Sequence, residues 1–489
     1  MQVTPDLDGF LDLAASRRIV PVRTTVLADR ETAVSAFEAL AVGDGPAFLL
    51  ESVEGGERWA RWSFLGWDPL FTITARDGET VVEGVDLQVR GDDPLGALEA
   101  VVDHFASPEI PGLPPLHGGL VGYLAYDAVR YVEHLPDRPH DDRGLPEMAF
   151  QAASSLAAFD RFAQTITLIR NVIVDDDPAA AYGSAVDALE DAAARLGRPT
   201  AHPVRPLPSF DDRPEATASM TQEEYEAAVR TAVRHIEAGD AFQVVPSIRL
   251  EVPFDGDAFA VYRALRLLNP SPYMFFVRQG GVSIAGSSPE LMVRSRDGRV
   301  FSRPIAGTRP RGATPEEDRA NEEELLADPK ERAEHVMLVD LARNDLGRVA
   351  EFGSVAVDDL MVIERYSHVL HIVSGVSGTL REGVGPVDVL RATFPHGTVS
   401  GAPKVRAMEI IDDLEPVARG PYAGAVGYLD FSGNLDTAIS LRTMVAADGK
   451  AWVQAGAGVV ADSDPASEYR ECLAKAAAVL AAIGGAKDV

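Results

Sequence analysis

The sequence has few of the residues that form disulfide cross-links, and its first two thirds lack lysine. It holds one cysteine, Cys472, and no lysine precedes Lys330. A single cysteine excludes an internal disulfide, which fits a reducing compartment. The missing lysines exclude any lysine-dependent catalysis before residue 330. These shortages favour a cytoplasmic protein and narrow the choice of catalytic groups.

Long hydrophobic runs and positive charge are also scarce. No apolar run approaches the ~20 residues that a membrane-spanning helix needs, and the first residues lack the basic-then-apolar order of a secretory signal. The 45 Lys and Arg residues face 75 Asp and Glu, for a net charge of −30 at pH 7. Such a surface repels a phosphate backbone. We therefore expect no membrane partner and no nucleic-acid partner.

The length and a proline-rich stretch predict two parts. A chain of 489 residues with 46% hydrophobic residues can bury a large core and exceeds the usual size of one domain. The segment from Arg198 to Pro214 is dense in proline and follows an alanine-rich helical stretch that ends near Gly197. We predict an N-terminal domain over 1–197, a linker over 198–219 and a second domain over 220–489.

Periodicity predicts mixed helices and strands in both parts. The runs AFLLESV, LFTITA and TITLIRNVIV are rich in strand-forming residues and lie between glycine and aspartate turns. In the second part, Thr221 and Glu224 form a capping-box pattern before a helix that Gly239 ends, and the strand AFQVVPSIRL should follow. The pattern indicates an α+β protein.

Two helices share an unusual arrangement of glutamates. In DPKERAEHVMLVDLARNDLGRV, Asp328 can cap a helix, and Glu331 falls at the capping-box position. Glu334 lies one turn further along the same face, where no cap explains it. By itself this spacing is also typical of a solvated helix surface.

The second helix, DSDPASEYRECLAKAAAVLAAI, repeats the arrangement with Glu468 and Glu471 on its first turns. Carboxylates that converge from two helices suit a hard cation such as Mg²⁺. That ion keeps some waters and takes further ligands from an anionic substrate.

A series of ordered blocks surrounds these helices and resembles one enzyme family. They are GSSPELMV, SRPIAGTRPRG, DPKERAEHVMLVDLARNDLGR, FPHGTVSGAPKVRAMEII, GPYAGAVGY, DTAISLRTMV and VQAGAGVVADSDP. Together they are similar to the successive blocks of the chorismate-utilising enzymes, from Met220 to the C-terminal end. The segment LLESVEGGERWARWSFLG also resembles the large subunits of anthranilate synthases. The resemblance implies a two-lobed β-sandwich with helices packed outside.

Two positions distinguish the products that this family makes. Members that add water carry a lysine base where this chain has Gln243, and a glutamine amide cannot accept that proton. Many aminodeoxychorismate synthases carry a nucleophilic lysine where this chain has Ala306. Both substitutions favour direct addition of ammonia at C2 of chorismate, with loss of the 4-hydroxyl and then of pyruvate. The resemblance thus implies anthranilate synthesis, the first committed step of tryptophan biosynthesis.

The resemblance also assigns roles to single residues. Mg²⁺ would be held by Glu334 and Glu471, with Glu331 and Glu468 as second-sphere or water-mediated partners, and would bind the ring carboxylate of chorismate. Glu290 would be the general acid, although a strand-end carboxylate is the simpler interpretation. His371 would assist proton transfer or pyruvate elimination, with His368 as its structural neighbour. The implied substrate-binding residues are Gly307, Thr308, Tyr422, Arg442, Gly456, Ala457 and Gly458.

Tryptophan is the regulator that the resemblance implies. Ser52, Pro272, Tyr273 and Met274 match the tryptophan-binding positions of feedback-inhibited anthranilate synthases. A hydroxyl, an aromatic ring and a thioether suit an indole amino acid, but the same residues would also serve as ordinary core.

A partner is expected as well. A cysteine-type glutaminase needs a nucleophilic cysteine in a strand-to-helix turn, whereas Cys472 lies in an amphipathic helix. Ammonia should therefore come from a separate glutamine amidotransferase subunit, in a hetero-oligomer of two large and two small subunits. Two alternatives stay open at this point: an aminodeoxychorismate or aminodeoxyisochorismate synthase, and a non-catalytic tryptophan-binding homologue.

Overall fold

The structure of the chain is a computed structural model. It describes all residues except 53–60, 88, 90–92, 175, 199–205 and 367–368. The helices in the described ranges are α1 (Leu7–Ala14), α2 (Ala33–Leu40), α3 (Pro94–Phe105), η1 (Tyr126–Tyr131), α4 (Pro178–Leu196), α5 (Gln222–Glu237), α6 (Ala258–Leu268), α7 (Pro315–Ala327), α8 (Pro329–Gly347), α9 (Pro386–Thr393), α10 (Gly397–Ser400), α11 (Lys404–Leu414), α12 (Pro465–Gly485) and η2 (Ala486–Asp488).

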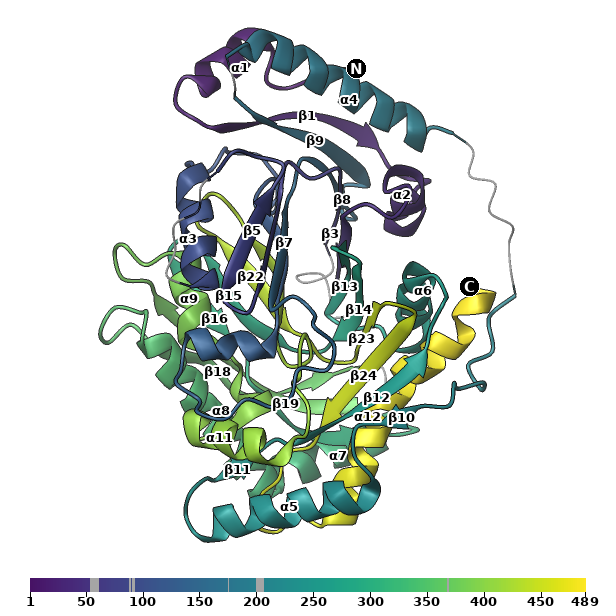
Figure 1. Cartoon of the computed structure of the whole chain (residues 1–489), viewed down its shortest axis with the longest axis vertical. Helices are drawn as coiled ribbons and strands as arrows, with labels where there is room; N and C mark the ends of the chain where they lie inside the picture. Colours follow the sequence, from purple (N-terminus) through teal and green to yellow (C-terminus); the bar gives the residue numbers. More distant parts are fainter. Residues whose placement is uncertain (53–60, 88, 90–92, 175, 199–205, 367–368) are drawn as a thin grey trace.

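Two large antiparallel sheets form the centre of the molecule (Figure 1). The first sheet has the order β1 (Ile19–Leu27), β9 (Thr165–Ile173), β8 (Ser155–Asp160), β3 (Trp62–Trp67), β2 (Ala47–Glu51), β13 (Tyr273–Gln279), β14 (Val282–Ser288), β23 (Thr443–Ala447), β24 (Lys450–Gly456), β12 (Ser247–Pro253), β10 (Thr217–Ala218).

The second sheet is built in the same way from both parts of the chain. Its order is β17 (Ile305–Pro310), β19 (Val369–Thr379), β16 (Arg299–Ser302), β15 (Leu291–Arg296), β22 (Leu435–Ile439), β21 (Ala425–Leu429), β6 (Leu120–Leu124), β7 (Met148–Ala152), β4 (Thr72–Arg76), β5 (Glu79–Glu83), with β18 (Ala356–Arg365) paired to β19. A short pair, β11 (Gln243–Val244) and β20 (Gly401–Ala402), lies apart.

Strand alternation assigns side chains to one core between the sheets and to others on their outer faces. Phe48 of β2 and Phe275 of β13 point into the core between the sheets, which also holds Tyr123 of the second sheet. The next residues along the same strands, Leu49 and Phe276, point outward and pack under α2, α4, α5, α6 and α12. Helices α3, α8, α9 and α11 cover the outer face of the second sheet. The α+β sandwich with outer helices is confirmed.

The two sheets have a common seam. Strands up to residue 173 form one block in each sheet, and strands from residue 217 onward form the other. The blocks meet at β2–β13 in the first sheet and at β6–β21 in the second. The division at 198–219 remains a prediction, and 199–205 lie outside the described residues; residues 206–216 carry no helix or strand.

The local predictions correspond to elements of the structure. Thr221 and Glu224 form a complete capping box at the start of α5. Asp328 and Asp464 cap α8 and α12, each followed by proline at the first helical position. The predicted strand AFQVVPSIRL is interrupted between β11 and β12, because Val245 and Pro246 leave the strand conformation.

Candidate functional site

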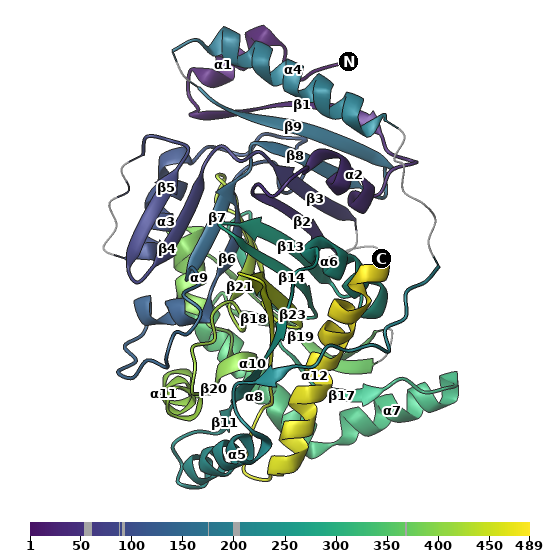
Figure 2. The same cartoon turned by 45° about the vertical axis from the view of Figure 1, so that its right-hand side comes forward.

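A cleft of about 200 Å³ lies where strand ends from both sheets meet α10 and α12. Figure 2 shows these two helices and α8 in the same half of the molecule. Residues far apart in the sequence share its wall. The predicted residues that line it are Glu290, Ala306, Thr308, His371, Tyr422, Arg442, Gly456 and Gly458.

Glu290 follows β14 and is almost completely enclosed. It is 3% exposed, and Thr398 Oγ1 donates a hydrogen bond of 2.8 Å to its Oε1. Burial raises the pKa of Glu290 to about 8, and the Thr398 hydroxyl offsets only part of that effect. The carboxyl group therefore holds its proton at neutral pH, as donation to a leaving group requires.

His371 lies on β19 opposite a bulge in β17. The strand register shifts between Ala306 and Thr308, and Gly307 takes a φ of +74°, which glycine adopts without strain. The bulge places the Gly307 carbonyl oxygen 3.1 Å from His371 Nδ1. A carbonyl only accepts, so Nδ1 carries the hydrogen and Nε2 keeps its lone pair in the neutral ring. Burial lowers the pKa of His371, which favours this neutral form.

The Thr308 hydroxyl lies 3.1 Å from the same Nδ1 atom. Gly307 itself does not line the cleft, and a Cβ there would lie 3.1 Å from Glu331 Oε2. The predicted neighbour His368 lies outside the described residues.

Arg442 and Tyr422 give the cleft a positive and an aromatic wall. Arg442 occupies the turn between β22 and β23, and its Nη1 lies 3.4 Å from Asn269 Oδ1. The Tyr422 ring stacks 5.6 Å from the guanidinium carbon of Arg419. Burial raises the pKa of the Tyr422 hydroxyl, which therefore stays neutral. This wall can attract and orient an anionic ring.

The small residues of the 456–458 turn keep the cleft open. A Cβ on Gly456 would lie 2.9 Å from the Tyr422 hydroxyl, and one on Gly458 would lie 2.5 Å from Gln243 Nε2. The Ala457 amide donates to the Pro246 carbonyl, and its side chain packs in the core. Of this turn, Gly456 and Gly458 therefore face the cleft.

The glutamates of α8 are engaged in different ways. Gln243 Nε2 donates to Glu334 Oε1 at 3.3 Å. Burial and then the charge of Glu331 raise the pKa of Glu334, and Glu471 adds to that effect from α12. Glu331 pairs with Arg309 at 2.9 Å. The expected capping box at Glu331 is wrong, because the Asp328 amide donates instead to the carbonyls of Glu324 and Leu325.

On α12 the charge of Glu471 acts on Glu468. Burial raises the pKa of Glu468, and the charge of Glu471 raises it further. Glu471 pairs with Lys475 Nζ at 2.7 Å. Negative charge from two helices thus accumulates beside the cleft, which a bound cation would relieve.

The side chains present fit Mg²⁺ with an incomplete protein shell. Within the described ranges, no group of three or more acidic, histidine or cysteine side chains is close enough to hold a metal alone. Mg²⁺ commonly takes one or two carboxylates and completes its shell with water and substrate oxygens. Gln243 Oε1 is buried beside Glu334 without a hydrogen-bond partner among the described residues. This orphaned oxygen beside a raised-pKa carboxylate suits a hydrated cation.

A second cavity, of about 390 Å³, lies on the seam between the two strand blocks. It is lined by Ser52, Pro272, Tyr273 and Met274, the residues that the sequence suggested for tryptophan. Arg294 joins its wall, donating to Tyr273 Oη at 3.0 Å and pairing with Asp436 at 2.8 Å. The cavity thus combines aromatic surface with a partly buried ion pair.

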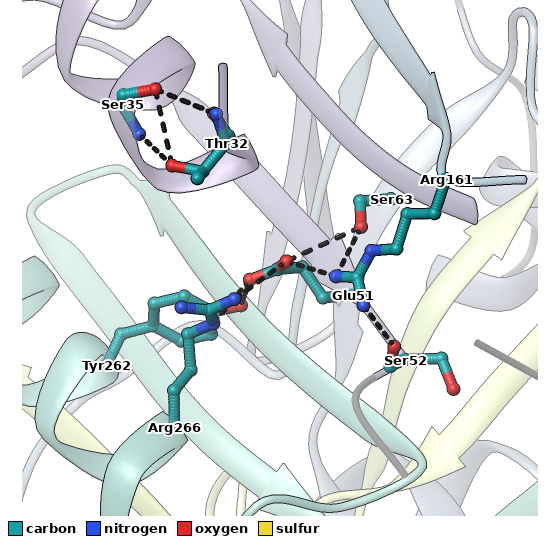
Figure 3. A network of polar contacts seen from close by, with 8 residues as sticks. All are labelled: Thr32, Ser35, Glu51, Ser52, Ser63, Arg161, Tyr262 and Arg266. Carbon is teal, nitrogen blue, oxygen red and sulfur yellow. Dashed lines mark hydrogen bonds and ion pairs between the residues drawn. The ribbon is translucent and has the colours of Figure 1, made fainter. Parts of the chain in front are cut away.

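The rim of this cavity is connected to α6 by a buried carboxylate (Figure 3). The side chain of Glu51 is fully buried and binds Tyr262 Oη at 2.6 Å, Arg266 Nε at 2.8 Å and Arg161 Nη2 at 2.7 Å. Arg161 also donates to the Ser52 carbonyl. Helix α6 in turn packs against α12, so a continuous set of contacts joins the cavity rim to the helix of Glu471.

Comparison with known proteins decides the family. The model that describes chorismate-binding enzymes matches residues 45–481. The chain belongs to the chorismate-binding enzyme family. It is 47% identical to anthranilate synthase component 1 of Acetivibrio thermocellus, with 99% of each chain covered. It is 50% identical to the protein of that name from Mycolicibacterium smegmatis, with 99% of this chain and 94% of the relative covered.

Solved structures agree with this membership. Anthranilate synthase component I from Streptococcus pneumoniae matches with a TM-score of 0.78 at 35% identity, covering 93% of this chain and 99% of that one. The menaquinone-specific isochorismate synthase of Escherichia coli matches with a TM-score of 0.72 at 20% identity over 98% of this chain and 99% of that one, and so shares the fold. The resemblance seen in the sequence blocks is confirmed, and the chain is an enzyme.

Three polar wall residues of this chorismate-binding enzyme were missed by sequence reasoning. Lys475 lies one turn after Glu471 on α12, and its Nζ donates to the Gly456 carbonyl at 2.9 Å. Thr398 and Gln454 also line the cleft. The four-residue spacing of Lys475 from Glu471 and the position of Thr398 inside FPHGTVSG were signals that could have identified them.

None of the described helices is long and apolar enough to cross a membrane.

Proposed function

We propose that this chorismate-binding enzyme is the large component of an anthranilate synthase. It adds ammonia to C2 of chorismate, releases the 4-hydroxyl as water, and then eliminates pyruvate to leave anthranilate. Relatives named anthranilate synthase component 1 cover nearly the whole chain at 47–50% identity. The observation that carries the choice of product is the pair of Ala306 in the cleft wall and Gln243, which lies behind Gly458 of that wall.

Neither Ala306 nor Gln243 can activate water or attack the ring. Ala306 lines the cleft, and Gln243 is buried against Glu334. Among the described wall residues, Lys475 is the one lysine. Its Nζ already donates to the Gly456 carbonyl and pairs with Glu471, so it is not available as a base or nucleophile. Ammonia needs no such activation, because it is a competent nucleophile when unprotonated.

Glu290 acts as the general acid of the first step. As ammonia forms the C2–N bond, both ring double bonds shift and the C4–O bond breaks, and the new ammonium group then loses one proton to solvent. The carboxyl proton of Glu290 passes to the departing oxygen, which leaves as water. The raised pKa supports this role, since an acid with an ordinary pKa near 4.5 would already be ionised at pH 7.

His371 serves the second step. Elimination of pyruvate needs a base for the C2 proton, and the neutral ring offers Nε2 because Nδ1–H is bound to Gly307. Arg442 and Tyr422 bind the enolpyruvyl carboxylate, together with backbone at Thr308, Gly456 and Gly458. Gly307 and Ala457 act from behind the wall, where they bind His371 and the Pro246 carbonyl.

Mg²⁺ would be held by Glu334 and Glu471, with Glu331 and Glu468 contributing through water. The ion, when bound, supplies positive charge for the ring carboxylate in a protein of net charge −30. Glu331 keeps its Arg309 partner in the present arrangement, which supports its indirect position.

Tryptophan inhibits the enzyme from the seam cavity. Its indole ring packs among Pro272, Tyr273 and Met274, and Ser52 contacts its polar end. Because β2 and β13 carry these residues from the two halves, a ligand there can change how the halves meet. The contacts from Glu51 through α6 to α12 support coupling to the cleft.

A separate glutaminase subunit supplies ammonia, in an assembly of two large and two small components. Cys472 cannot substitute for it. Its thiol is buried against the Tyr225 hydroxyl at 3.0 Å, and burial raises its pKa to about 12. The assignment of residues 1–197 to regulation and 220–489 to catalysis belongs to this proposal, as does a cytoplasmic location.

The test is product identification with the purified chain, chorismate, Mg²⁺ and ammonium at alkaline pH. Anthranilate and pyruvate should form in equal amounts, and glutamine should not replace ammonium. Aminodeoxychorismate, aminodeoxyisochorismate or isochorismate as the end product would overturn the proposal. Absence of turnover with intact tryptophan binding would instead favour a non-catalytic homologue.

A further inference from the structure

Glu290, Thr398 and His396 form a buried chain of contacts behind the cleft wall. Thr398 Oγ1 lies 2.8 Å from Glu290 Oε1 and 3.1 Å from His396 Nδ1. The direct distance between Glu290 Oε1 and His396 Nδ1 is 3.8 Å. The threonine hydroxyl is therefore the atom that bridges the acid and the imidazole.

The bridging hydroxyl has one hydrogen and two acceptors within reach. It can donate to Glu290 Oε1 or to His396 Nδ1, but not to both at full strength. When Glu290 is ionised, its carboxylate is the stronger acceptor. When Glu290 is neutral, with its proton on Oε2 for transfer to the departing 4-hydroxyl, Oε1 is only a weak carbonyl-type acceptor, and the imidazole nitrogen can take the threonine hydrogen instead.

His396 is suited to be that second acceptor. It is 6% exposed and caps α10, where its Nδ1 accepts the Thr398 backbone N–H at 3.3 Å. Nδ1 must therefore carry a lone pair. Burial lowers the pKa of His396 to about 3, and the nearby charge of Lys404 contributes. The ring is neutral at working pH, and the proton of the pair stays on Glu290.

The other charged groups around Glu290 come from different elements. Lys475 on α12 and Arg442 between β22 and β23 both favour the carboxylate. Lys404 on α11 is paired with Asp345 of α8 at 2.8 Å. His371 shares the cleft wall. Lys475 and Arg442 stabilise the ionised form, so holding the protonated form in place requires a specific partner.

We infer that His396 is a positioning residue that takes the Thr398 hydroxyl hydrogen whenever Glu290 is protonated, so that one threonine serves both ionisation states of the acid. The inference rests on the proposed function. As the carboxyl O–H bond of Glu290 breaks, a new O–H bond forms on the departing 4-hydroxyl. The Thr398 hydrogen then rotates from His396 Nδ1 to Glu290 Oε1. No heavy atom has to move, and no further proton is gained or lost.

The test compares His396 variants that keep or remove the acceptor. Asparagine carries its side-chain oxygen where Nδ1 lies and can still cap α10, whereas leucine of similar size cannot accept. Glutamine is a polar second choice whose oxygen reaches too far, in case the leucine variant does not fold. Each is assayed for kcat/KM with chorismate from pH 6 to 10, with total ammonium adjusted to hold free ammonia constant.

The expected readout is the alkaline limb of the profile, where Glu290 loses its proton. In His396→Leu and His396→Gln, the Thr398 hydroxyl loses the acceptor that it uses when Glu290 is protonated. The protonated acid is then less stable, so the alkaline limb should move to lower pH by about half to one unit. His396→Asn should stay close to the original enzyme. Equal profiles for all three variants would overturn the inference.

Replacing Thr398 should shift the alkaline limb in the opposite direction. Thr398→Val removes the donor that stabilises the carboxylate, so its alkaline limb should move to higher pH, while Thr398→Ser should not shift. In the Thr398→Val background, His396→Leu should cause no further shift, because His396 acts through that hydroxyl. An additional shift in the double variant would contradict the bridging role.

Glu290→Gln distinguishes a failure of the proposed acid role of Glu290 from a failure of the positioning role of His396. If this variant keeps normal turnover, Glu290 is not the acid and the proposed function fails at that residue. If Glu290→Gln is inactive but the His396 variants keep the original profile, only the role of His396 is refuted.

Discussion

The chemistry of single residues depends on how completely each is buried. Glu290 and His371 were predicted from sequence blocks, yet no block could show that one is enclosed and protonated while the other is fixed by a backbone carbonyl. Burial raises the pKa of Glu290 although Thr398 partly offsets the effect, and the Gly307 carbonyl fixes His371; these neighbours reach the site from other segments. Lys475 escaped prediction because a lysine four residues after a glutamate is also an ordinary helix pair.

Glu290 should make stability depend on pH in a defined direction. Its pKa is about 8 when folded and near 4.5 when unfolded, so folding takes up a proton between these values. Its stabilising contribution is complete below pH 4.5, declines as pH rises, and is lost above about 8. Glu290→Gln avoids this loss. Its melting temperature relative to the original enzyme should rise by a few degrees from pH 5 to pH 8.5.

That experiment uses differential scanning calorimetry at constant ionic strength. Glu316→Gln on the exposed surface of α7 provides a matched control and should show no pH-dependent difference. A Glu290→Gln difference that is constant across the range would mean that the carboxyl is ionised in the folded protein.

Arg442→Lys should weaken chorismate binding more than it slows chemistry. Lysine keeps the charge but loses the planar pair of donors that matches a carboxylate. We expect KM for chorismate to rise about tenfold, with a smaller change in kcat, in steady-state assays at saturating ammonia. Arg343→Lys on the exposed face of α8 is the control. A fall in kcat alone would assign Arg442 to the chemical step instead.

At the scale of elements, helices were easier to predict than strand partners. The starts of α5, α8 and α12 follow from local capping residues and proline, which act within one turn. The pairing of β6 with β21 joins residues about 300 positions apart, and no local pattern encodes it. The cleft depends on such pairings, so its residues could be suggested by resemblance but not positioned.

Helices α8 and α12 should act together in binding Mg²⁺. Glu334→Gln and Glu471→Gln each keep side-chain size while removing one charge from the cluster. Each should raise the Mg²⁺ concentration for half-maximal activity by ten-fold or more, measured with chelator-buffered titrations. Isothermal titration with Mg²⁺ in the absence of substrate gives a second readout.

Asp340→Asn provides the matched control, because Asp340 is an exposed acid of α8 that pairs with Arg343. It should leave the titration unchanged. If Glu334→Gln and Glu471→Gln behave like Asp340→Asn, both glutamates are surface carboxylates rather than ligands.

At the scale of the whole molecule, the two cavities should influence each other. If tryptophan weakens the binding of chorismate, chorismate must weaken tryptophan binding by the same factor, usually between about 5 and 150. Tryptophan binding is measured by calorimetry with and without chorismate, and ammonia is omitted to prevent turnover. Equal affinities would exclude coupling.

Tyr273→Ala tests whether the seam cavity is the site. It removes an aromatic wall of that cavity and should abolish tryptophan binding while turnover with ammonia persists. Tyr469→Ala, on the partly exposed side of α12, removes an aromatic ring elsewhere. Loss of tryptophan binding in both variants would indicate general damage rather than a specific site.

The seam has a further consequence for how the protein is made. Residues up to 173 leave the ribosome first, and they include β2 and β6, whose outer edges have no partner until β13 and β21 have been synthesised. Unpaired edges recruit other strands and promote aggregation. Because β21 ends at Leu429, nearly nine tenths of the chain must be translated before both edges are closed. Chaperone demand should therefore be greatest late in synthesis.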